Sequence, residues 1–317
     1  MENSPNAKHI KKRKWLIRIV LTVIAMAFSI LFSKENGQAA GETEIRTEMF
    51  FDSQGNPSEL TIHFLDVGEA SCALITCDGE NMLFDTGSND TGDSVMQYIK
   101  DQGIEHFKYV IGSHLDIDHI GGMDVILANF SYENILLPNY EKVTKSYQDV
   151  LKVIDLRKSI ITRPIVGNTY TLGYAKFTIL APNSYDYDGV SNNYSICILL
   201  QHGNKRFLFT GDAEEPAEKD ILKNNIIINA DVYVAGHHGS RSSSSEDFVN
   251  AINPEYAIIS CGEGNDFGFP DSEVLNRFRK DGIKVFRTDK QGTIIVKSDG
   301  NSLTWNMDPD ESWQPGQ

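Results

Sequence analysis

The sequence predicts an α/β fold in which two β-sheets pack face to face and helices cover their outer faces, a four-layer αββα sandwich. Short apolar or alternating segments bounded by Gly, Asp or Asn recur along the chain, which is typical of strands joined by tight turns. Segments with helical spacing separate many of these strands. The pattern restarts after Pro164, so we expect two successive strand-rich halves, each with its own helices.

In the first half, the short, largely apolar run Phe107–Gly112 is typical of a buried strand. The other strands expected in this half are Glu59–Val67, Cys72–Thr76 and Asn81–Phe84. The expected helices are Thr91–Gln102, Met123–Asn129 and Tyr147–Arg157.

In the second half, Asp231–Ala235 and Tyr256–Ser260 have the composition of buried strands. The other expected strands are Lys176–Leu180, Tyr194–Gln201, Arg206–Thr210, Lys284–Arg287, Thr293–Lys297 and Ser302–Trp305. The expected helices are Ala213–Asn224, Glu246–Ile252 and Asp271–Asp281.

Residues 1–40 differ in composition from the rest of the chain. A basic run, Lys8–Lys14, precedes an apolar stretch without acidic residues, Trp15–Phe32, and the small pair Ala39–Ala40 follows. This order is typical of a secretory signal peptide. A stretch of about 18 apolar residues is also near the lower limit for crossing a bilayer, so an uncleaved N-terminal membrane anchor is the alternative. Both interpretations place the remainder outside the cytoplasm, secreted or held at the outer face of the membrane.

The chain beyond residue 40 is long enough for one large α/β domain with a substantial core. We expect a linker at 41–58, the folded domain at 59–307 and a flexible polar tail at 308–317. Residues 1–40 hold seven of the 29 Lys and Arg and two of the 44 Asp and Glu, so 22 basic and 42 acidic residues remain, a net charge of −20. Such a surface disfavours polyanions unless a basic groove or bound metal offsets its charge.

The four cysteines fall in segments of strand character, among small or apolar neighbours: Cys72, Cys77, Cys197 and Cys261. No CxxC pair is present, so a thiolate metal site is not expected. We predict free, buried thiols that act as small hydrophobic side chains. A Cys197–Cys261 disulfide is the alternative in an exported protein.

The densest chemical signal is the segment Ser113–Gly122 (SHLDIDHIGG), directly after an expected apolar strand. It holds four potential ligands within six residues: His114, Asp116, Asp118 and His119. Imidazole and carboxylate groups suit zinc, manganese or iron, so this spacing predicts a metal-binding loop. A polar, hydrogen-bonded loop would be the better interpretation for one His beside one Asp, but not for this cluster.

Two further segments also follow expected apolar strands. In FTGD, a Gly turn presents Asp212, whose single carboxylate is suited to bridging two cations, although capping of the next helix is the alternative. In GHHGS, the adjacent His237 and His238 point in different directions, so one can bind a metal while the other contacts substrate or transfers a proton. Three ligand-bearing loops at strand ends are more simply explained by one site than by three.

The order of the motifs FLDVG, FDTG, SHLDIDHIGG, NNYS, FTGD and GHHGS resembles the metallo-β-lactamase superfamily. Within it, the chain is similar to the soluble domain of ComEC-type competence proteins, which take up DNA, and to their stand-alone relatives. The resemblance covers roughly residues 60–300. It implies an αββα sandwich with one or two divalent metal ions at its edge, zinc first and manganese as the alternative.

The resemblance also implies roles for individual residues. The implied metal ligands are His114, Asp116, Asp118, His119, Asp212 as the bridging carboxylate, and His237, with His238 as the alternative late ligand. Asp85 would orient the histidine loop from behind. The implied catalytic residues are Asp118, Asp212, His238 and Asn193, the last two through contact with phosphoryl oxygens or protonation of the leaving group.

Several positions depart from the pattern of the family. Asp116 replaces the second His of the common HxHxDH loop, and Asn192–Asn193 stands where a ligand His is usual. Phe269 stands where the ComEC-like relatives often have His, and Glu69 lies in a segment, GEAS, that replaces their usual GQGD. These changes bear on the second metal ion and on the substrate more than on the first metal ion.

We therefore expect an extracytoplasmic metal-dependent hydrolase that uses a metal-bound hydroxide. A phosphodiester is the favoured substrate: DNA by resemblance, or a smaller cell-wall or lipid headgroup ester by charge. A lactone or β-lactam hydrolase on the same fold, and a non-catalytic, metal-stabilised envelope module that assists DNA uptake, are the alternatives. The motifs of a serine nucleophile elbow and of a phosphate-binding P-loop are absent.

Two further features each have two interpretations. The run Ser240–Ser245 is either a flexible lip over the site or a polar loop that caps the next helix. The aromatic residues Phe267, Phe269 and Trp305 either line a pocket or pack in the core, and core packing is favoured.

Overall fold

The computed structural model of the chain describes Phe51 and residues 58–316. The signal peptide or anchor expected in residues 1–40 lies outside the described residues, as does nearly all of the expected linker. No helix within the described part combines the length and the apolar character needed to cross a membrane.

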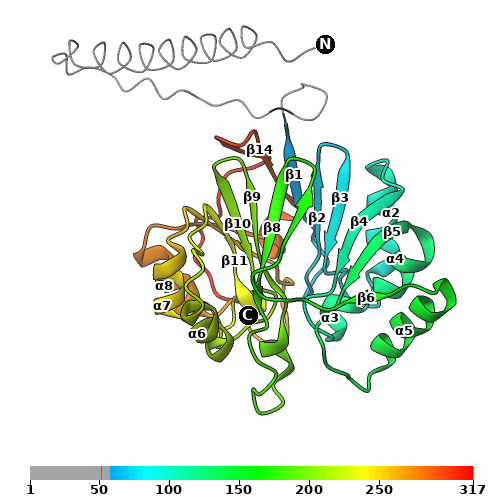
Figure 1. Ribbon diagram of the computed structural model, residues 1–317. Coiled ribbons are helices and arrows are strands. Elements are labelled where there is room, and N and C mark those ends of the chain that lie inside the picture. Colours follow the sequence, from blue (N-terminus) through cyan, green and yellow to red (C-terminus); the bar gives the residue numbers. More distant parts are fainter. Residues whose placement is uncertain (1–50, 52–57, 317) are drawn as a thin grey trace, which may run out of the picture. The chain divides into compact units, whose positions relative to one another are not determined.

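The described residues form two mixed β-sheets (Figure 1). The first has the order β15-β14-β1-β2-β3-β4-β5-β6, and the second has the order β13-β12-β11-β10-β9-β8-β7. The strands of the first sheet are β1 (Leu60–Phe64), β2 (Ala73–Cys77), β3 (Glu80–Phe84), β4 (His106–Ile111), β5 (Ser131–Leu136), β6 (Ile161–Thr162), β14 (Ile294–Ser298) and β15 (Leu303–Trp305). Those of the second are β7 (Thr169–Leu172), β8 (Ala175–Ala181), β9 (Cys197–His202), β10 (Lys205–Phe209), β11 (Val232–Val234), β12 (Tyr256–Ile259) and β13 (Lys284–Arg287).

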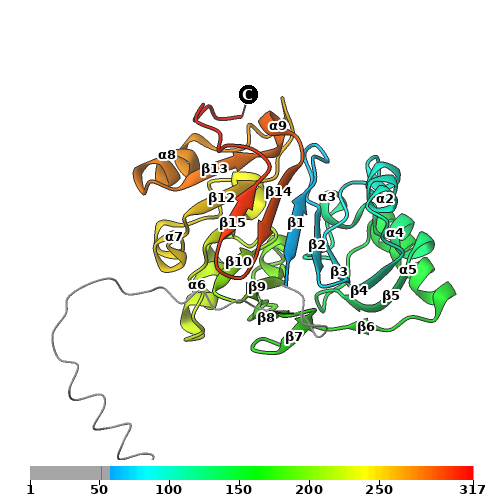
Figure 2. The same ribbon diagram turned by 90° about the horizontal axis from the view of Figure 1, so that it is seen from above.

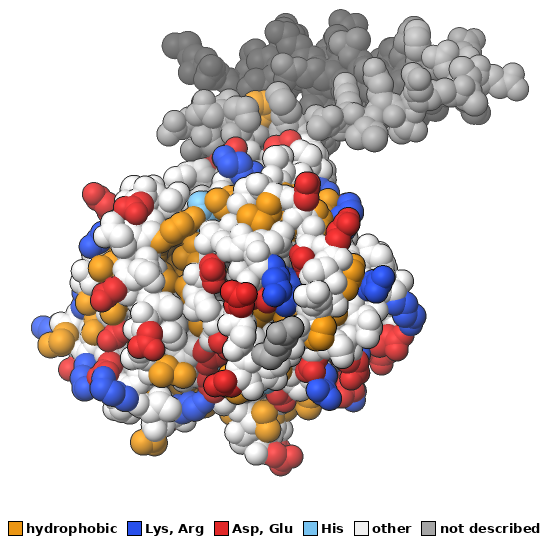
Figure 3. All heavy atoms as spheres, turned by 180° about the vertical axis from the view of Figure 1, so that it is seen from behind, with side chains coloured by type: hydrophobic (Ala, Val, Ile, Leu, Met, Phe, Trp, Pro, Cys, Tyr) orange, Lys and Arg blue, Asp and Glu red, His pale blue; other side chains and the backbone are white. Residues whose placement is uncertain are grey.

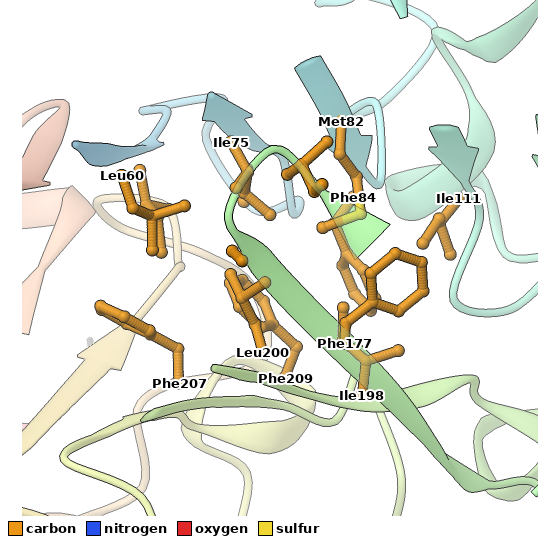
Figure 4. Close-up of a cluster of buried hydrophobic side chains, with 14 of the residues drawn as sticks. Leu60, Ile75, Met82, Phe84, Ile111, Phe177, Ile198, Leu200, Phe207 and Phe209 are labelled. Atoms are coloured by element: carbon orange, nitrogen blue, oxygen red, sulfur yellow. The ribbon is translucent and has the colours of Figure 1, made fainter. Parts of the chain in front are cut away.

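One hydrophobic cluster lies between the two sheets (Figure 4). Side chains such as Leu60, Ile75 and Phe84 from the first sheet face Phe177, Leu200 and Phe209 from the second. On β10, Phe207 and Phe209 point into this core, while Leu208 between them points to the opposite face. Both faces of this strand are therefore apolar, which explains the continuous hydrophobic run in its sequence.

Helices cover the outer face of each sheet (Figure 2). Those on the first sheet are α2 (Gly92–Asp101), α4 (Met123–Asn129) and α5 (Lys145–Arg157), and those on the second are α6 (Glu215–Lys223), α7 (Glu246–Ile252) and α8 (Ser272–Lys280). Helix α8 shows why these helices pack on a sheet: Val274, Leu275 and Phe278 form one buried stripe on an otherwise polar helix. The predicted four-layer α/β sandwich is confirmed.

The C-terminal strands differ from the expected arrangement of two successive halves. Strand β14 leaves the second half of the sequence and pairs antiparallel with β1, with Val296 opposite Ile62. Its apolar residues Ile294 and Val296 join the core between the sheets. The first sheet is therefore built from both ends of the described chain.

All four cysteines are free and buried, as predicted, and the Cys197–Cys261 disulfide is not formed. Burial raises the pKa of the Cys77 thiol to about 12. These side chains therefore stay protonated at neutral pH and act as hydrophobic groups.

The tail, for which the sequence predicts flexibility, is attached to the domain as far as residue 316. The backbone N–H of Asp310 donates to Val285 O at 2.7 Å, and that of Gly316 donates to Pro270 O at 3.0 Å. The guanidinium of Arg287 donates to the carbonyl of Gln314. The polar composition of the tail gives no information about these contacts. They depend on the position of the last strand of the second sheet, which lies beside the tail only in the folded domain.

We expect Arg287→Ala to lower the free energy of unfolding by about 3–5 kcal/mol, because the substitution leaves a buried carboxylate without its partner. Arg287 is fully buried, and its Nε and Nη2 lie 3.0 and 2.6 Å from the carboxylate oxygens of Asp289. Urea denaturation measures the loss. The matched control is Arg241→Ala, which removes an exposed guanidinium from its ion pair with Asp271 and should cost no more than about 1 kcal/mol. Equal losses in the two variants would contradict the expectation.

Candidate metal centre

Four strands deliver the predicted site residues to one edge of the sandwich. Asp85 directly follows β3, and the histidine loop follows β4, which pairs parallel with β3. Asp212 follows β10, and His237 and His238 follow β11, which pairs parallel with β10. Because the carboxyl ends of parallel neighbours lie at the same edge of a sheet, each sheet contributes a pair of adjacent loops.

Gly211 allows the loops of the two sheets to meet. It has a φ of +52°, and a Cβ at this position would lie 2.6 Å from the Cβ of Ser113. Around this contact, Ile196 N donates to Ser113 O at 2.7 Å and Asp212 N donates to Ser195 Oγ at 3.1 Å. Only glycine fits this conformation and this space, so the GD pair of the FTGD motif brings Asp212 to the histidine loop.

Four side chains form the centre of the site: Asp118, His119, Asp212 and His238, with ligand atoms that all lie within 4.8 Å of one another. His119 Nε2 lies 3.1 Å from Asp212 Oδ1 and 3.3 Å from Asp118 Oδ2. His238 Nε2 lies 3.1 Å from the same Asp118 oxygen. Two imidazoles and two carboxylates at these distances are a suitable ligand set for zinc or another divalent transition metal.

Two more of the predicted ligands, His114 and His237, lie around the second oxygen of Asp212, which is also 3.9 Å from His238 Nε2, and a third, Asp116, lies beside His114. His114 Nε2 is 3.8 Å from Asp212 Oδ2 and 3.8 Å from Asp116 Oδ1. His237 Nε2 is 3.9 Å from Asp212 Oδ2. These separations are too long for hydrogen bonds but leave room for a second cation bound to the same carboxylate.

Two buried nitrogen atoms test whether the site suits a metal ion. The Nε2 atoms of His114 and His119 are buried and have no hydrogen-bond partner within the described residues. A buried polar atom without a partner is costly, and such atoms are rare in native proteins. Both atoms face the carboxylates of the cluster, so a divalent cation would satisfy them and the site fits one.

Outer contacts fix the orientation of the two central imidazoles. Asp85 is fully buried, and its Oδ2 lies 2.7 Å from His119 Nδ1 while its two oxygens also accept from the N–H and hydroxyl of Ser113. His238 Nδ1 lies 2.7 Å from Ser260 O, and a carbonyl can only accept. Both rings therefore carry the proton on Nδ1 and present Nε2 to the cluster. This is the position that the sequence predicts for Asp85.

The charges of the cluster shift the pKa values of its members strongly. Burial alone would raise the pKa of Asp118 and of Asp212, but the neighbouring histidines, His119 first, lower both. Burial alone would lower the pKa of His238, but the carboxylates of Asp212 and Asp118 raise it to about 9. The carboxylates thus remain ionised at neutral pH, and metal binding must release protons from the imidazoles.

Asn193 lies outside the cluster of four. Its side chain is buried, and its Oδ1 accepts from the backbone N–H of Glu214 at 3.1 Å. Its neighbour Asn192 is closer to the histidine pair, with Nδ2 3.4 Å from His237 Nδ1. A catalytic role for Asn193 stays a prediction, and the observed contact positions the loop that follows Asp212.

Two charged side chains of the site were not predicted. The ammonium of Lys142 contacts Asp116 Oδ1, which also accepts from the hydroxyl of Ser191 at 3.2 Å. Glu214 Oε1 lies 3.4 Å from His237 Nδ1. Neither residue stands in a recognisable motif, and Lys142 comes from a loop 26 residues after Asp116, so the sequence gives no signal for this contact.

The serine run is not a flexible lip. Ser243 and Ser244 are fully buried, and the carboxylate of Glu218 on α6 accepts from the N–H groups of Ser244 and Ser245 at 2.5 and 3.0 Å. Arg277 on α8 donates to Ser244 O. Ser245 stands at the N-cap position of α7, but its side chain makes no capping hydrogen bond. The run is a buried connection that holds the segment after His238 in place.

Glu218 should make the stability of the metal-free protein depend on pH. Burial raises the pKa of its carboxyl from 4.5 to about 7. An acid with a raised pKa in the folded state contributes stability that is fully present below pH 4.5 and is lost as the pH rises through about 7. We expect this residue to lower the free energy of unfolding by about 2–3 kcal/mol between these limits.

Urea denaturation between pH 4.5 and pH 8, with a chelator present, tests this expectation. Glu218→Gln should show a flatter pH dependence than the unmodified protein, because the neutral amide does not titrate. Glu215→Gln, on the same helix but exposed, is the matched control and should keep the original slope. The same slope in both variants would show that Glu218 titrates normally.

A cavity of about 330 Å³ opens beside the cluster, and its lining includes Asp118, His237, His238, Glu69, Phe267 and Phe269. Core packing, the favoured interpretation for the aromatic residues, is wrong for Phe267, which is 71% exposed, and for Phe269, which also lines the cavity. Both interpretations hold in part for Trp305, which is half-buried: it packs against the core and stacks on Phe286 with ring centroids 4.2 Å apart, and it also lines a separate cavity.

The sequence is similar to that of known proteins over most of the described residues. The sequence model of the metallo-beta-lactamase superfamily matches residues 65–167 and 185–263. ComE operon protein 3 of Bacillus subtilis is 26% identical over 270 residues, which are 80% of this chain and 35% of that protein. Recombination protein 2 of Haemophilus influenzae is 30% identical over 237 residues, 73% of this chain and 28% of that protein. The chain thus spans about a third of the length of these relatives.

Two solved structures share the fold at low identity. The metallo-beta-lactamase fold protein YhfI of Bacillus subtilis has a TM-score of 0.51 and 12% identity, and the match covers 77% of this chain and all of that one. CmlA, a diiron beta-hydroxylase from Streptomyces venezuelae, has a TM-score of 0.50 and 13% identity, and the match covers 74% of this chain and 53% of that one. At these identities the likeness concerns the fold alone, and a fold does not determine the chemistry of its site.

Proposed function

Because the chain belongs to the metallo-β-lactamase superfamily, we propose that it is an extracytoplasmic metal-dependent hydrolase that cleaves phosphodiesters. The predicted resemblance to ComEC-type competence proteins is confirmed, since the relatives include ComE operon protein 3 and a competence protein ComA. The observation that carries the proposal is the cluster of four ligand side chains, together with two buried imidazole nitrogens that have no hydrogen-bond partner among the described residues, one within the cluster (His119) and one beside it (His114). The substrate class and the extracytoplasmic location rest on the sequence arguments above.

Asp118, His119, Asp212 and His238 would hold the first cation, and His114, Asp116 and His237, together with Asp212, would hold a second one. From the sequence, His237 was expected to bind the metal and His238 to act in catalysis. We exchange these two roles at the first cation, because His238 is buried in the cluster whereas the side chain of His237 is 22% exposed. Zinc is the proposed metal, since the set combines four imidazoles with three carboxylates, and manganese is the alternative. Lys142 competes with the second cation for Asp116, so the first position should fill at lower metal concentration.

The side chains of the site have separate tasks in the proposed hydrolysis. When bound, a divalent cation lowers the pKa of a water molecule and polarises the phosphoryl oxygen. Asp118 and Asp212 are held ionised by the neighbouring imidazoles, so they can accept hydrogen bonds from that water and orient it. His237 lines the cavity and has Glu214 at its Nδ1, an arrangement that supports proton donation from Nε2 to the leaving oxygen when one cation is bound.

Charge favours a small phosphodiester, or the end of a chain, over a long nucleic acid. Figure 3 shows acidic side chains scattered over one face of the molecule, with lysines and arginines in separate small groups rather than in a continuous strip. The cavity itself is lined by the carboxylates of Glu69, Asp90 and Asp118. Such a surface gives little of the phosphate attraction that supports non-specific binding of DNA.

The test is a hydrolysis assay on the full chain after metal removal and reloading with zinc or manganese. Bis-p-nitrophenyl phosphate and single-stranded DNA are assayed in parallel, and metal content is measured by atomic spectroscopy. We expect metal-dependent release of p-nitrophenolate, with DNA cleaved slowly or not at all. A protein that binds metal but turns over neither substrate would contradict the proposal and favour a lactone or β-lactam hydrolase or a non-catalytic envelope module.

A further inference from the structure

We propose that the cavity beside the cluster is a binding subsite for a planar heteroaromatic ring that carries an N–H group, such as a nucleobase attached to the scissile phosphate. The inference rests on the proposed function and names the group that this chain selects next to its metal centre. Phe267 and Glu69 are the residues that would determine this specificity.

Phe267 and Phe269 form an aromatic platform at the mouth of the cavity. Their rings are stacked, with centroids 5.5 Å apart and an interplanar angle of 14°. Phe269 in turn lies nearly parallel to the ring of His238, with centroids 6.5 Å apart and an angle of 20°. An exposed Phe beside the metal cluster leaves apolar surface in water, and a planar ring bound against it would remove that cost.

The loop that carries the platform is fixed before any ligand binds. Asn265 is buried, and its Oδ1 accepts from the N–H groups of Phe267 and Phe269 at 3.2 and 3.0 Å. Its Nδ2 donates to the carbonyls of Gly262 and Phe269 at 2.9 and 2.7 Å. The side chain thus uses both its donor and its acceptor atoms within the loop, so little conformational entropy remains to be lost on binding.

Glu69 provides a hydrogen-bond acceptor in the same cavity. Its Oε2 accepts from Gly262 N at 2.7 Å, which ties it to the platform loop, whereas its Oε1 is buried without a partner among the described residues. A carboxylate oxygen can only accept, so a ligand N–H would satisfy it. Nucleobases combine a flat face for stacking with ring or exocyclic N–H groups for such a contact.

The same features argue against an alkyl group at this position. Ile117 lies on the histidine loop, is 55% exposed and adds an apolar surface to the cavity, which would also accept a lipid chain. A lipid chain, however, carries no donor and would leave the buried Oε1 of Glu69 unpaired, whereas a ring N–H would supply the missing partner. The volume of about 330 Å³ falls at the lower end of small-molecule sites, which suits one ring and its sugar.

Three phosphodiesters with the same leaving group test the inference on the metal-loaded full chain: the p-nitrophenyl esters of cytidine 5′-monophosphate, benzyl phosphate and methyl phosphate. We expect kcat/KM to be highest for the cytidine ester and lowest for the methyl ester. Phe267→Ala should lower kcat/KM for both ring-bearing esters about tenfold and leave the methyl ester nearly unchanged, because only the stacking contact is lost. Phe267→Trp should retain the preference, and both variants should fold because the side chain is exposed.

Glu69→Gln separates the N–H contact from stacking. The variant keeps an acceptor for Gly262 but presents an amide N–H to the ring, so the cytidine ester should fall to the level of the benzyl ester. If all three esters react equally in every variant, the inference is wrong and the proposed function stands. If none reacts although metal is bound, the proposed function fails. In that case, calorimetry still tests the subsite by comparing the affinity of cytidine 5′-monophosphate for the unmodified protein and for Phe267→Ala. Weaker binding to the variant would support the subsite, and equal binding to both proteins, or no binding to either, would overturn it.

Discussion

Asp212→Asn should abolish metal-dependent hydrolysis and remove the metal from the site. We expect the loss of activity to exceed the roughly 100-fold that removal of an outer contact to a metal ligand typically costs. Asp212 is the carboxylate that faces both cation positions, with Oδ1 3.1 Å from His119 Nε2 and Oδ2 3.8 Å from His114 Nε2. The isosteric amide removes the negative charge and directs an N–H₂ group at imidazole nitrogens that are needed as ligands.

The measurement combines metal content per protein with hydrolysis of bis-p-nitrophenyl phosphate over a range of zinc concentrations. Activity should not return at high zinc, because the bridging ligand itself is missing. The matched control is Asp247→Asn, an exposed Asp in the first turn of α7, which should bind metal and react like the unmodified protein. Retention of metal and activity by Asp212→Asn would show that the cluster is not the catalytic centre.

The pattern of apolar and polar residues predicted those helices and strands whose buried side chains can be recognised within their own sequence. Helices α4 and α7 and strand β13 have the bounds that the periodicity indicates, because a stripe of apolar residues is enough to define each of them. Strand β5 (SYENIL) was missed, because its first four residues are partly or fully exposed and only its end is buried. It exists because it pairs in parallel with β4, a contact between distant segments that no local window contains.

The same distinction separates the site residues that the sequence predicted from those that it missed. The ligand residues were predicted because they are clustered in three short motifs directly after apolar strands. Residues that are close together in such a motif are also close together in the structure. Lys142 contacts Asp116 from a loop whose own sequence shows no metal-binding pattern, and Glu214 contacts His237 from a position two residues beyond the FTGD motif, which the motif does not include. Phe267 was assigned to the core because large apolar side chains are usually buried, and its exposure beside the cluster follows from the hydrogen bonds that Asn265 makes within its loop.

Asp85→Asn should weaken metal binding about 10- to 100-fold without removing any ligand. The carboxylate of Asp85 accepts from Ser113 N at 2.7 Å and from Ser113 Oγ at 2.9 Å, and its Oδ2 holds His119 Nδ1 at 2.7 Å. An amide offers one acceptor oxygen, so its N–H₂ group meets either the backbone N–H of Ser113, at the position of Oδ1, or both the Ser113 hydroxyl and His119 Nδ1, at the position of Oδ2. The left-handed backbone of Asp85, with φ of 60°, suits Asn equally well, so the change concerns hydrogen bonding and charge alone.

Competition with a chromogenic chelator measures the zinc affinity, and hydrolysis is then followed at increasing zinc. Because the ligands of the cluster are intact, activity of Asp85→Asn should recover at high zinc, which separates it from Asp212→Asn. Asp78→Asn is the matched control, since Asp78 also has a left-handed backbone and accepts from Ser58 Oγ and Tyr174 N but is not part of the cluster. It should lose stability without losing zinc affinity. If both variants bind zinc as the unmodified protein does, the contact between Asp85 and His119 does not tune the metal site, and the orientation of that ring must come from the packing of the histidine loop.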